Sequence, residues 1–313
     1  MQKPLDIIFM GTPAFAVPPL DALAAAGHRV LTAVTQPDRP VGRGRKLTPS
    51  PVKRTALRLG IPLRQPEKIR TEAFARELAM LTPDILVVVA FGRILPRALL
   101  DLPRLGAVNI HGSLLPRYRG PAPIQWAVIN GEAVTGVTAM LMDEGLDTGP
   151  ILCAREEPIR PDDTSATLHD RLSVAGAGLL IEALEGLAAG TLTPVAQDNR
   201  LATYAPMLSK QDGRIPWEQP ARRLECFVRG MIPWPGAFTF YGNRRLKIFR
   251  VQSLALETSE VPGRVLPGFE DELRVATGDG VLSILEIQGE SGKRLPIRDF
   301  LRGCDLPPGT LLA

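Results

Sequence analysis

In the first 111 residues, short runs of apolar residues alternate with segments in which apolar and polar residues recur at helical spacing. The apolar runs predict four strands, at residues 6–10, 29–35, 84–91 and 107–111. Apolar residues recur at helical spacing over residues 15–26 and 71–81, which predicts helices there. Strands that alternate with helices indicate an α/β fold with a mostly parallel, Rossmann-like sheet, whose ligands bind at the carboxyl ends of the strands.

The pattern changes after residue 134. Two β-prone runs, 135–142 and 151–158, flank a glycine-containing turn and predict an antiparallel pair, and a long helix is predicted from residue 165 to about 187. Residues 197–209 are polar and irregular, which is typical of a linker. We therefore expect a first domain over residues 1–196, the linker at 197–209, and a second domain over 210–313.

The last third of the chain consists of short β-like runs separated by glycine and proline. These runs lie at residues 236–241, 246–256, 263–266, 273–277 and 281–288. Five short strands of this kind predict a small OB-like β-barrel.

Composition and length are those of a globular protein of about two domains, with 313 residues, 45% hydrophobic and 22% charged. No uninterrupted apolar run approaches the roughly 20 residues of a membrane span. The N-terminus lacks the apolar core of a signal peptide, so a cytoplasmic protein without membrane attachment is expected. Three scattered cysteines and three histidines argue against a disulfide framework or a metal site.

Positive charge is concentrated in one stretch of a chain whose net charge is only +4. Residues 36–76 hold eleven basic and three acidic residues. For residues 53–76 a solvated helix face is a sufficient explanation. The loop at residues 42–46, GRGRK, contains no apolar anchor and matches no Walker A motif, so it indicates a polyanionic partner whose phosphates it contacts.

Candidate chemistry lies at the end of the strand predicted at residues 107–111. Alternation along a strand places Asn109 and His111 on one face. An asparagine amide can donate to a developing oxyanion, and a histidine can move protons near neutral pH. Asp147, on the glycine-containing turn, can hold the imidazole in one tautomer and favour its charged form. The three suit attack of an amine on a carbonyl, although a satisfied His–Asp pair in a polar core explains the pattern equally well.

Two motifs resemble the signature of the formyltransferase superfamily: NIHGSLLPRYRG at residues 109–120 and DEGLDTG at residues 143–149. GTPAFA at residues 11–16 and QPDRPVGRG at residues 36–44 narrow the resemblance to the methionyl-tRNA formyltransferase family. PWPGAF at residues 233–238 extends it into the second domain, so the resemblance covers nearly the whole chain.

The resemblance implies a Rossmann-like formyltransferase domain and an OB-like domain that contacts tRNA. Direct transfer without a covalent enzyme intermediate is expected because no Ser or Cys lies in a nucleophile-elbow pattern. The resemblance also implies 10-formyltetrahydrofolate as the formyl donor and the α-amino group of initiator methionyl-tRNA as the acceptor, and we expect a monomer. The catalytic residues by resemblance are Asn109, His111 and Asp147. The folate-binding residues by resemblance are Phe91, Gly92, Arg93, Ile94, Leu95, Ser113, Leu114, Leu115, Pro116 and Asp143. The tRNA-binding residues by resemblance are Arg39, Arg43, Arg45 and Lys46.

Three alternatives share parts of the pattern. A sugar-nucleotide formyltransferase has similar catalytic motifs, but its small acceptor does not need so many basic residues. A glycinamide ribonucleotide formyltransferase would lack the second domain. A non-catalytic folate- or RNA-binding module has no use for an acid–base pair at the strand end.

Overall fold

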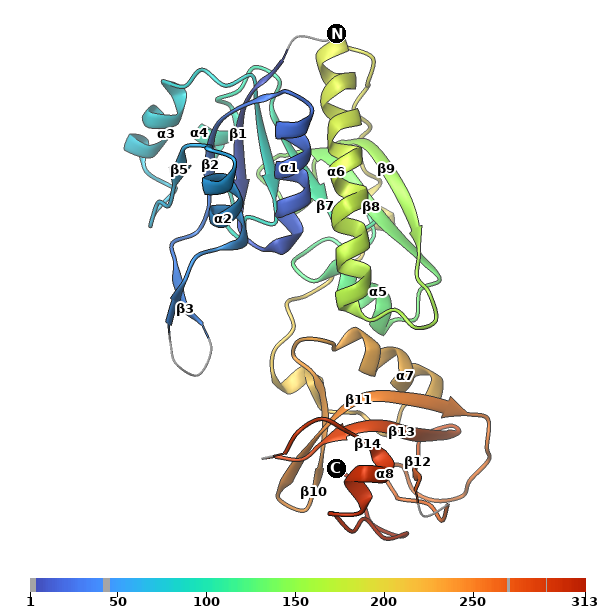
Figure 1. Ribbon diagram of the computed structural model, residues 1–313. Coiled ribbons are helices and arrows are strands. Elements are labelled where there is room, and N and C mark those ends of the chain that lie inside the picture. Colours follow the sequence, from blue (N-terminus) through green and yellow to red (C-terminus); the bar gives the residue numbers. More distant parts are fainter. Residues whose placement is uncertain (1–3, 42–45, 269–270, 291) are drawn as a thin grey trace. The chain divides into compact units, whose positions relative to one another are not determined.

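The computed structural model describes residues 4–41, 46–268, 271–290 and 292–313 and divides into two compact units. The first unit contains Met1–Pro123, Val134–Pro158 and His169–Ala205. The second unit contains Ile124–Ala133, Ile159–Leu168 and Pro206–Ala313. Each unit has its own sheet (Figure 1).

The first unit is built on a seven-stranded sheet in the order β5-β2-β1-β6-β7-β8-β9. The strands are β1 Asp6–Gly11, β2 Arg29–Val34, β5 Leu63–Arg64, β6 Ile85–Val89, β7 Ala107–His111, β8 Val134–Leu141 and β9 Ile151–Pro158. The pairs from β5 to β7 are parallel, and β8 and β9 are antiparallel. The predicted mostly parallel sheet and the predicted antiparallel pair are confirmed.

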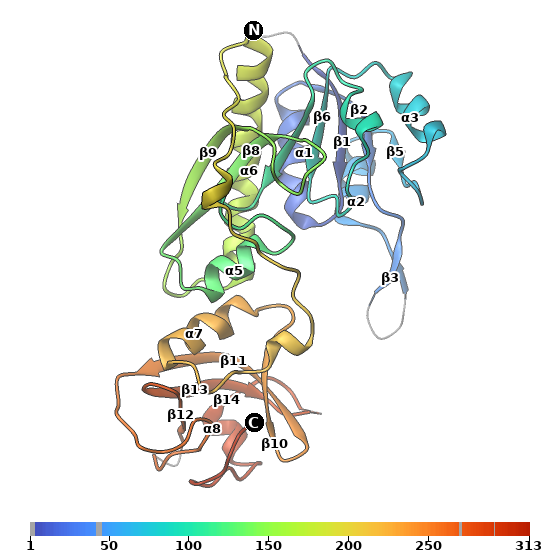
Figure 2. The ribbon, with the colours of Figure 1, turned by 180° about the vertical axis from the view of Figure 1, so that it is seen from behind.

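Helices cover both faces of this sheet (Figures 1 and 2). They are α1 Val17–Ala25, after the short 3₁₀ helix η1 Ala14–Ala16, then α2 Pro51–Arg58, α3 Glu72–Ala79, α4 Arg97–Leu100 and α6 Ser165–Ala189. Alternate residues of β1 and β6, such as Ile8 and Val88, form a buried core with Phe74 of α3 and Leu99 of α4. On the opposite face Ile110 of β7 lies against α6 at Gly176.

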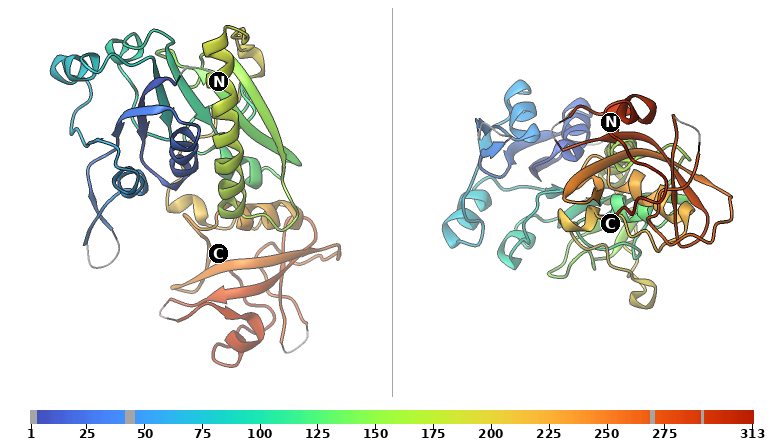
Figure 3. Two further views of the ribbon diagram at one scale, coloured as in Figure 1. Left: turned by 45° about the horizontal axis from the view of Figure 1, so that its top comes forward. Right: turned by 90° about the horizontal axis from the view of Figure 1, so that it is seen from below.

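Among the described helices, α6 is the one whose length and apolar composition would allow it to cross a membrane. An 18-residue window in it has a mean hydropathy of 1.5, a feature that inspection for uninterrupted apolar runs misses. Buried core helices meet the same criterion, and α6 contributes buried Leu172, Leu179, Leu180 and Leu184. Figure 3 shows this yellow-green helix running beside the green strands β8 and β9.

A short hairpin precedes α2. β3, Arg39–Val41, pairs antiparallel with β4, Lys46–Thr48. α2 begins directly afterwards: the Ser50 hydroxyl caps it by accepting from the backbone N–H of Lys53, and Pro51 occupies its first turn. The hairpin is therefore anchored to the sheet through β2 on one side and a capped helix on the other.

The second unit contains a five-stranded antiparallel sheet, which confirms the predicted separate β domain. Its strands are β10 Ala237–Tyr241, β11 Arg244–Leu254, β12 Leu273–Ala276, β13 Val281–Gln288 and β14 Leu295–Pro296. The predicted strand at 263–266 is wrong, because residues 264 and 265 form only isolated bridges to Leu311 and Val275. The fifth strand is β14, which pairs with β13.

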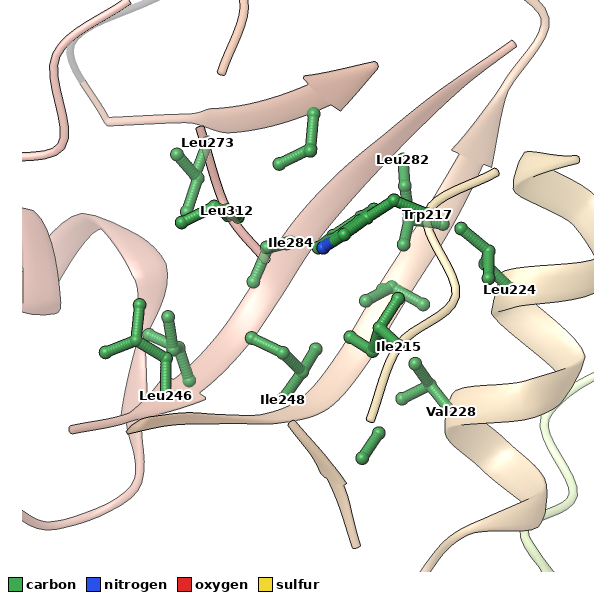
Figure 4. Packing of buried hydrophobic residues seen from close by; sticks show 14 of the residues in the cluster. Ile215, Trp217, Leu224, Val228, Leu246, Ile248, Leu273, Leu282, Ile284 and Leu312 are labelled. Carbon is green, nitrogen blue, oxygen red and sulfur yellow. The ribbon is translucent and has the colours of Figure 1, made fainter. Parts of the chain in front are cut away.

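The core of the second unit surrounds Trp217 (Figure 4). The Trp217 side chain is 3% exposed, and its indole N–H donates to the Thr239 hydroxyl at 3.1 Å. Leu224 and Val228 of α7, Ala221–Gly230, pack with Ile248 and Ile284 of the sheet. This unit also contains α5 Pro123–Ile129 and α8 Ile297–Leu301. Helices α4, α5, α7 and α8 were not predicted from the sequence.

Candidate active site

Strand β7 places Asn109 and His111 on the face of the sheet opposite α6. Val108 and Ile110 point the other way, since side chains alternate along a strand, and Ile110 meets α6. Asn109 is 9% exposed and His111 7% exposed. Among the described residues, no hydrogen bond engages the Asn109 side-chain amide. Both predicted catalytic residues of β7 therefore lie together at the carboxyl end of the strand.

The ring of His111 has a defined orientation. Its Nε2 lies 2.9 Å from the backbone carbonyl oxygen of Tyr118. A carbonyl can only accept, so Nε2 carries a proton and donates it to this bond. Nδ1 lies 3.7 Å from Oδ2 of Asp147, which is too long for a hydrogen bond. The Tyr118 carbonyl, rather than Asp147 as expected from the sequence, therefore fixes the tautomer, and Asp147 adds a negative charge beside Nδ1.

The turn after β7 is held by residues that the sequence did not single out. Tyr118 has a positive φ of 58°, and its backbone N–H donates to the Thr203 hydroxyl at 2.8 Å. Thr138 of β8 donates to the carbonyl of Ser113 at 2.7 Å and accepts from the N–H of Leu115 at 3.1 Å. Ser113 in turn donates to the carbonyl of Arg117 at 2.6 Å. No motif signals the contacts of Thr138 and Thr203, because they connect positions far apart in the chain.

Asp147 is held by the same turn. Its Oδ2 accepts from the backbone N–H of Gly120 at 2.8 Å, and its backbone has a positive φ of 54°. Gly120 has a φ of 111°, and a Cβ there would meet the Tyr204 ring at 2.6 Å. Asp143, predicted to contact folate, is exposed, and its Oδ1 accepts from the N–H of Gly145 and the hydroxyl of Thr148. Asp143 therefore shapes the turn that presents Asp147.

The loop after β6, residues 91–95, is built on the ends of neighbouring strands. The Phe91 carbonyl accepts from the Thr12 hydroxyl at 3.3 Å and from Gln36 Nε2 at 2.9 Å. Gly92 has a φ of 77°, and Arg93 donates to the carbonyls of two preceding loop residues, 66 and 67.

The side chains of the predicted folate residues differ in exposure. Phe91, Leu95, Ser113 and Leu115 are buried, Arg93, Leu114 and Pro116 are half-buried, and Gly92, Ile94 and Asp143 are exposed. Contacts from Phe91 and Leu95 to any ligand would therefore be made through the backbone.

The basic stretch divides into two parts. Lys53, Arg58, Arg64 and Arg76 each pair with a carboxylate, of Asp38, Asp21, Glu77 and Glu72 respectively. This agrees with a solvated helix face. Arg39 and Lys46 on the hairpin are exposed, and no carboxylate among the described residues pairs with them. Arg43 and Arg45 lie outside the described residues.

Possible metal ligands and a cavity among the described residues also bear on the chemistry. No group of three or more His, Cys, Asp or Glu residues is placed to hold a metal ion in the described parts of the chain. A cavity of about 510 Å³ lies between η1, α1, α2 and α6 and is lined by Arg54, Arg58, Asp170 and Ser173 among others. It lies on the α6 face, so the catalytic candidates of β7 do not open into it.

Comparison with known proteins identifies two matching family models. Residues 5–184 match the formyl transferase model, and residues 207–305 match the formyl transferase C-terminal domain model. The methionyl-tRNA formyltransferase of Citrifermentans bemidjiense is 52% identical over 308 residues, covering 98% of this chain and 96% of the relative. The methionyl-tRNA formyltransferase of Geobacter metallireducens is 51% identical, with 98% of each chain covered.

Among solved structures, an N-formyltransferase from Helicobacter canadensis in complex with folinic acid and dTDP-3-aminofucose matches with a TM-score of 0.67. It is 19% identical, and the match covers 94% of this chain and all of that one. At this identity the likeness shows the fold alone. The identity to the curated relatives and the two family models establish more: the chain belongs to the formyl transferase family and, within it, to the methionyl-tRNA formyltransferases.

Proposed function

We propose that the protein transfers the formyl group of 10-formyltetrahydrofolate to the α-amino group of methionine on initiator methionyl-tRNA. The observation that carries the proposal is that the chain is about 50% identical, over 98% of its length, to proteins named methionyl-tRNA formyltransferase. The arrangement of Asn109, His111 and Asp147 supports it, because these three groups suit attack of an amine on a carbonyl. The acceptor is a soluble tRNA, which supports the proposal that the enzyme acts in the cytoplasm. A monomer is the proposed oligomeric state.

Asn109 is the proposed oxyanion donor. As the amine nitrogen bonds to the formyl carbon, negative charge collects on the formyl oxygen, and a donor fixed on a strand stabilises that charge without having to reorganise. The largely buried amide of Asn109 at the end of β7 has the chemistry for this role. The carbon–nitrogen bond to the donor then breaks as the carbonyl re-forms.

His111 and Asp147 are the proposed proton-transfer pair. Because Nε2 is committed to the Tyr118 carbonyl, Nδ1 is the ring atom that can accept the proton lost by the attacking amine and return it to the leaving nitrogen. The carboxylate of Asp147, 3.7 Å away, places a negative charge beside the imidazolium formed between these two steps.

We propose that folate and tRNA bind to separate parts of the first unit and that the second domain adds contacts to the tRNA. For the folate we propose residues 91–95 and 113–116, which follow the parallel strands β6 and β7 at their carboxyl ends, where ligands of such sheets bind. We also propose Asp143, on the turn between the antiparallel strands β8 and β9. For the tRNA we propose Arg39, Arg43, Arg45 and Lys46, with further phosphate contacts from the domain at 210–313. The proposed domain limits remain 1–196, 197–209 and 210–313.

The test is formyl transfer from 10-formyltetrahydrofolate to initiator methionyl-tRNA and to a 4-amino sugar nucleotide, offered in parallel reactions. Transfer to the methionyl-tRNA alone is the expected result. Transfer to the sugar alone would keep the catalytic residues and the folate but remove the tRNA assignment. Transfer to neither, by protein that is folded and binds folate, would overturn the proposed function.

A further inference from the structure

We propose that Gln197 is a positioning residue that couples the two turns of the active site, so that proton transfer at His111 depends on an amide that touches neither substrate. The inference rests on the proposed function for its kinetic test. Gln197 lies in the stretch that the sequence predicts as a linker, and no motif draws attention to it.

All four hydrogen-bonding positions of the Gln197 amide are used. Its Nε2 donates to the backbone carbonyls of Asp147, at 2.9 Å, and Gly149, at 2.8 Å. Its Oε1 accepts from Arg119 Nε at 3.1 Å and from Arg119 Nη2 at 2.7 Å. A half-buried amide with every donor and acceptor satisfied has one orientation, because flipping it would place donors against donors.

These bonds join the two segments that orient His111. Arg119 follows Tyr118, whose carbonyl receives the Nε2 proton of His111. Asp147, on the other segment, presents its carboxylate to Nδ1 of the same ring. Gln197 therefore fixes the distance between the two groups that contact opposite nitrogens of one imidazole.

The Asp147 backbone gives a reason for such support. Its φ of 54° is uncommon for a residue other than glycine and persists only where surrounding contacts hold it. One contact is the Gly120 N–H at its side chain, and the other is Gln197 at its carbonyl. Without Gln197 the residue can relax, which moves the carboxylate relative to His111.

The test variant is Gln197→Met, which keeps the length of the side chain and removes all four bonds. We expect kcat to fall roughly 10²-fold, the scale associated with a misplacement of about 1 Å at a reacting group. KM for folate and tRNA should change little, because the hydrogen-bonding positions of the Gln197 amide are all used by Arg119, Asp147 and Gly149. Asn199→Ala is the matched control: Asn199 accepts from Arg119 Nη2, at 2.8 Å, and its side chain forms no hydrogen bond with the Asp147 turn in the described part of the chain. Its kcat should be close to that of the unsubstituted protein.

A double-mutant cycle separates positioning from a general structural role. If Gln197 acts through Asp147, Gln197→Met in an Asp147→Asn background should change kcat by no more than about twofold, the usual error of additivity. An undiminished effect in that background would overturn the proposal, as would a loss confined to KM. Should Gln197→Met fail to fold, Gln197→Glu retains the acceptors for Arg119 and replaces the donors to the Asp147 turn with a carboxylate oxygen, which repels the carbonyls of Asp147 and Gly149.

A second readout does not need activity. The chain has three histidines, so the ¹⁵N resonances of the His111 ring can be assigned by comparison with His111→Ala, and their chemical shifts report the groups beside Nδ1 and Nε2. The expected result is changed ring ¹⁵N chemical shifts for His111 in Gln197→Met and unchanged ones in Asn199→Ala. Identical spectra for the two variants would refute the coupling even if the protein formylates tRNA. A shift in a protein that formylates nothing would support the coupling and overturn only the proposed function.

Discussion

The turn after β7 and the hairpin β3–β4 are both predicted functional segments of the first unit, but they are held in different ways. Residues 113–120 form hydrogen bonds with Thr138, Thr203 and Asp147, and the His111 ring has a polar group at each nitrogen. The hairpin is a two-stranded ribbon whose residues 39 and 46 are exposed. The first segment defines the positions of atoms, and the second presents charge.

This difference follows from the two tasks. Proton transfer and oxyanion stabilisation require donors placed to within tenths of an ångström. Attraction of a polyanion depends mainly on the amount and sign of charge, since phosphate contacts act over several ångströms and tolerate motion. We therefore expect substitutions in the turn to change kcat, and substitutions in the hairpin to change KM for tRNA and its dependence on salt.

The largest effect is expected from His111→Ala. Loss of the general acid–base should lower kcat by roughly 10²–10⁴-fold, with folding retained. Steady-state kinetics with initiator methionyl-tRNA, together with a thermal melt, measure both. His169→Ala is a matched control, because His169 also faces an aspartate, Asp170, at 3.0 Å, but in α6. Near-normal turnover in His111→Ala would remove this residue from the mechanism.

Asn109→Ala should be somewhat milder, with kcat lowered by about 10²–10³-fold as one oxyanion donor is removed. Its KM values should stay near those of the unsubstituted enzyme, because the amide acts mainly in the transition state. An effect on KM alone would show that Asn109 only binds substrate. It would contradict the expectation that substitutions at the end of β7 and in the turn after it change kcat.

The part of this comparison that could be predicted from the sequence is the part encoded locally. Strands β1, β6 and β7 are apolar runs long enough to be recognised, and Asn109 and His111 share a face by alternation alone. Helix α3, Glu72–Ala79, follows from the helical spacing of apolar residues over 71–81. Of these elements, β7 carries the predicted site residues Asn109 and His111.

The contacts that finish the site are long-range and could not be predicted. Thr203 is 85 residues from Tyr118, and Gln197 is 50 residues from Asp147. A polar, irregular stretch is typical of a linker, and nothing in its composition indicates that it pairs with the catalytic turn. The same limit explains the role given to Asp147: the sequence supplies a His and an Asp, but only the fold shows that a backbone carbonyl holds the ring.

The hairpin side of the comparison is tested by the double variant Arg39→Ala, Lys46→Ala. Its KM for tRNA should rise, and the slope of log KM against log salt should fall by about 1 for each phosphate that is no longer contacted. Its kcat and its affinity for folate should stay unchanged. A parallel fall in kcat would show that the hairpin positions the acceptor and does more than attract it.

The smallest effect comes from the base of the hairpin, where Lys53 Nζ donates to Asp38 Oδ2 at 2.7 Å. The hydrogen bond from Lys53, followed by one from Gln65, holds the pKa of Asp38 below its ordinary value. Such a lowered pKa contributes stability above the unfolded pKa, and this contribution is lost as the pH falls through the folded pKa. In Lys53→Met the Tm should therefore be reduced near neutral pH, and the difference from the unsubstituted protein should close on acidification.

Asp38→Asn is the partner experiment, because it weakens the same pair with the opposite change of charge. If the hairpin acts through charge, Lys53→Met should raise KM for tRNA and Asp38→Asn should lower it, although both weaken the hairpin base. If the hairpin acts through its geometry, both variants should raise KM. The sign of the change in KM for Asp38→Asn therefore decides whether the charge of the hairpin is sufficient for its effect on tRNA binding. The exposure of Arg39 and Lys46 indicates that it is.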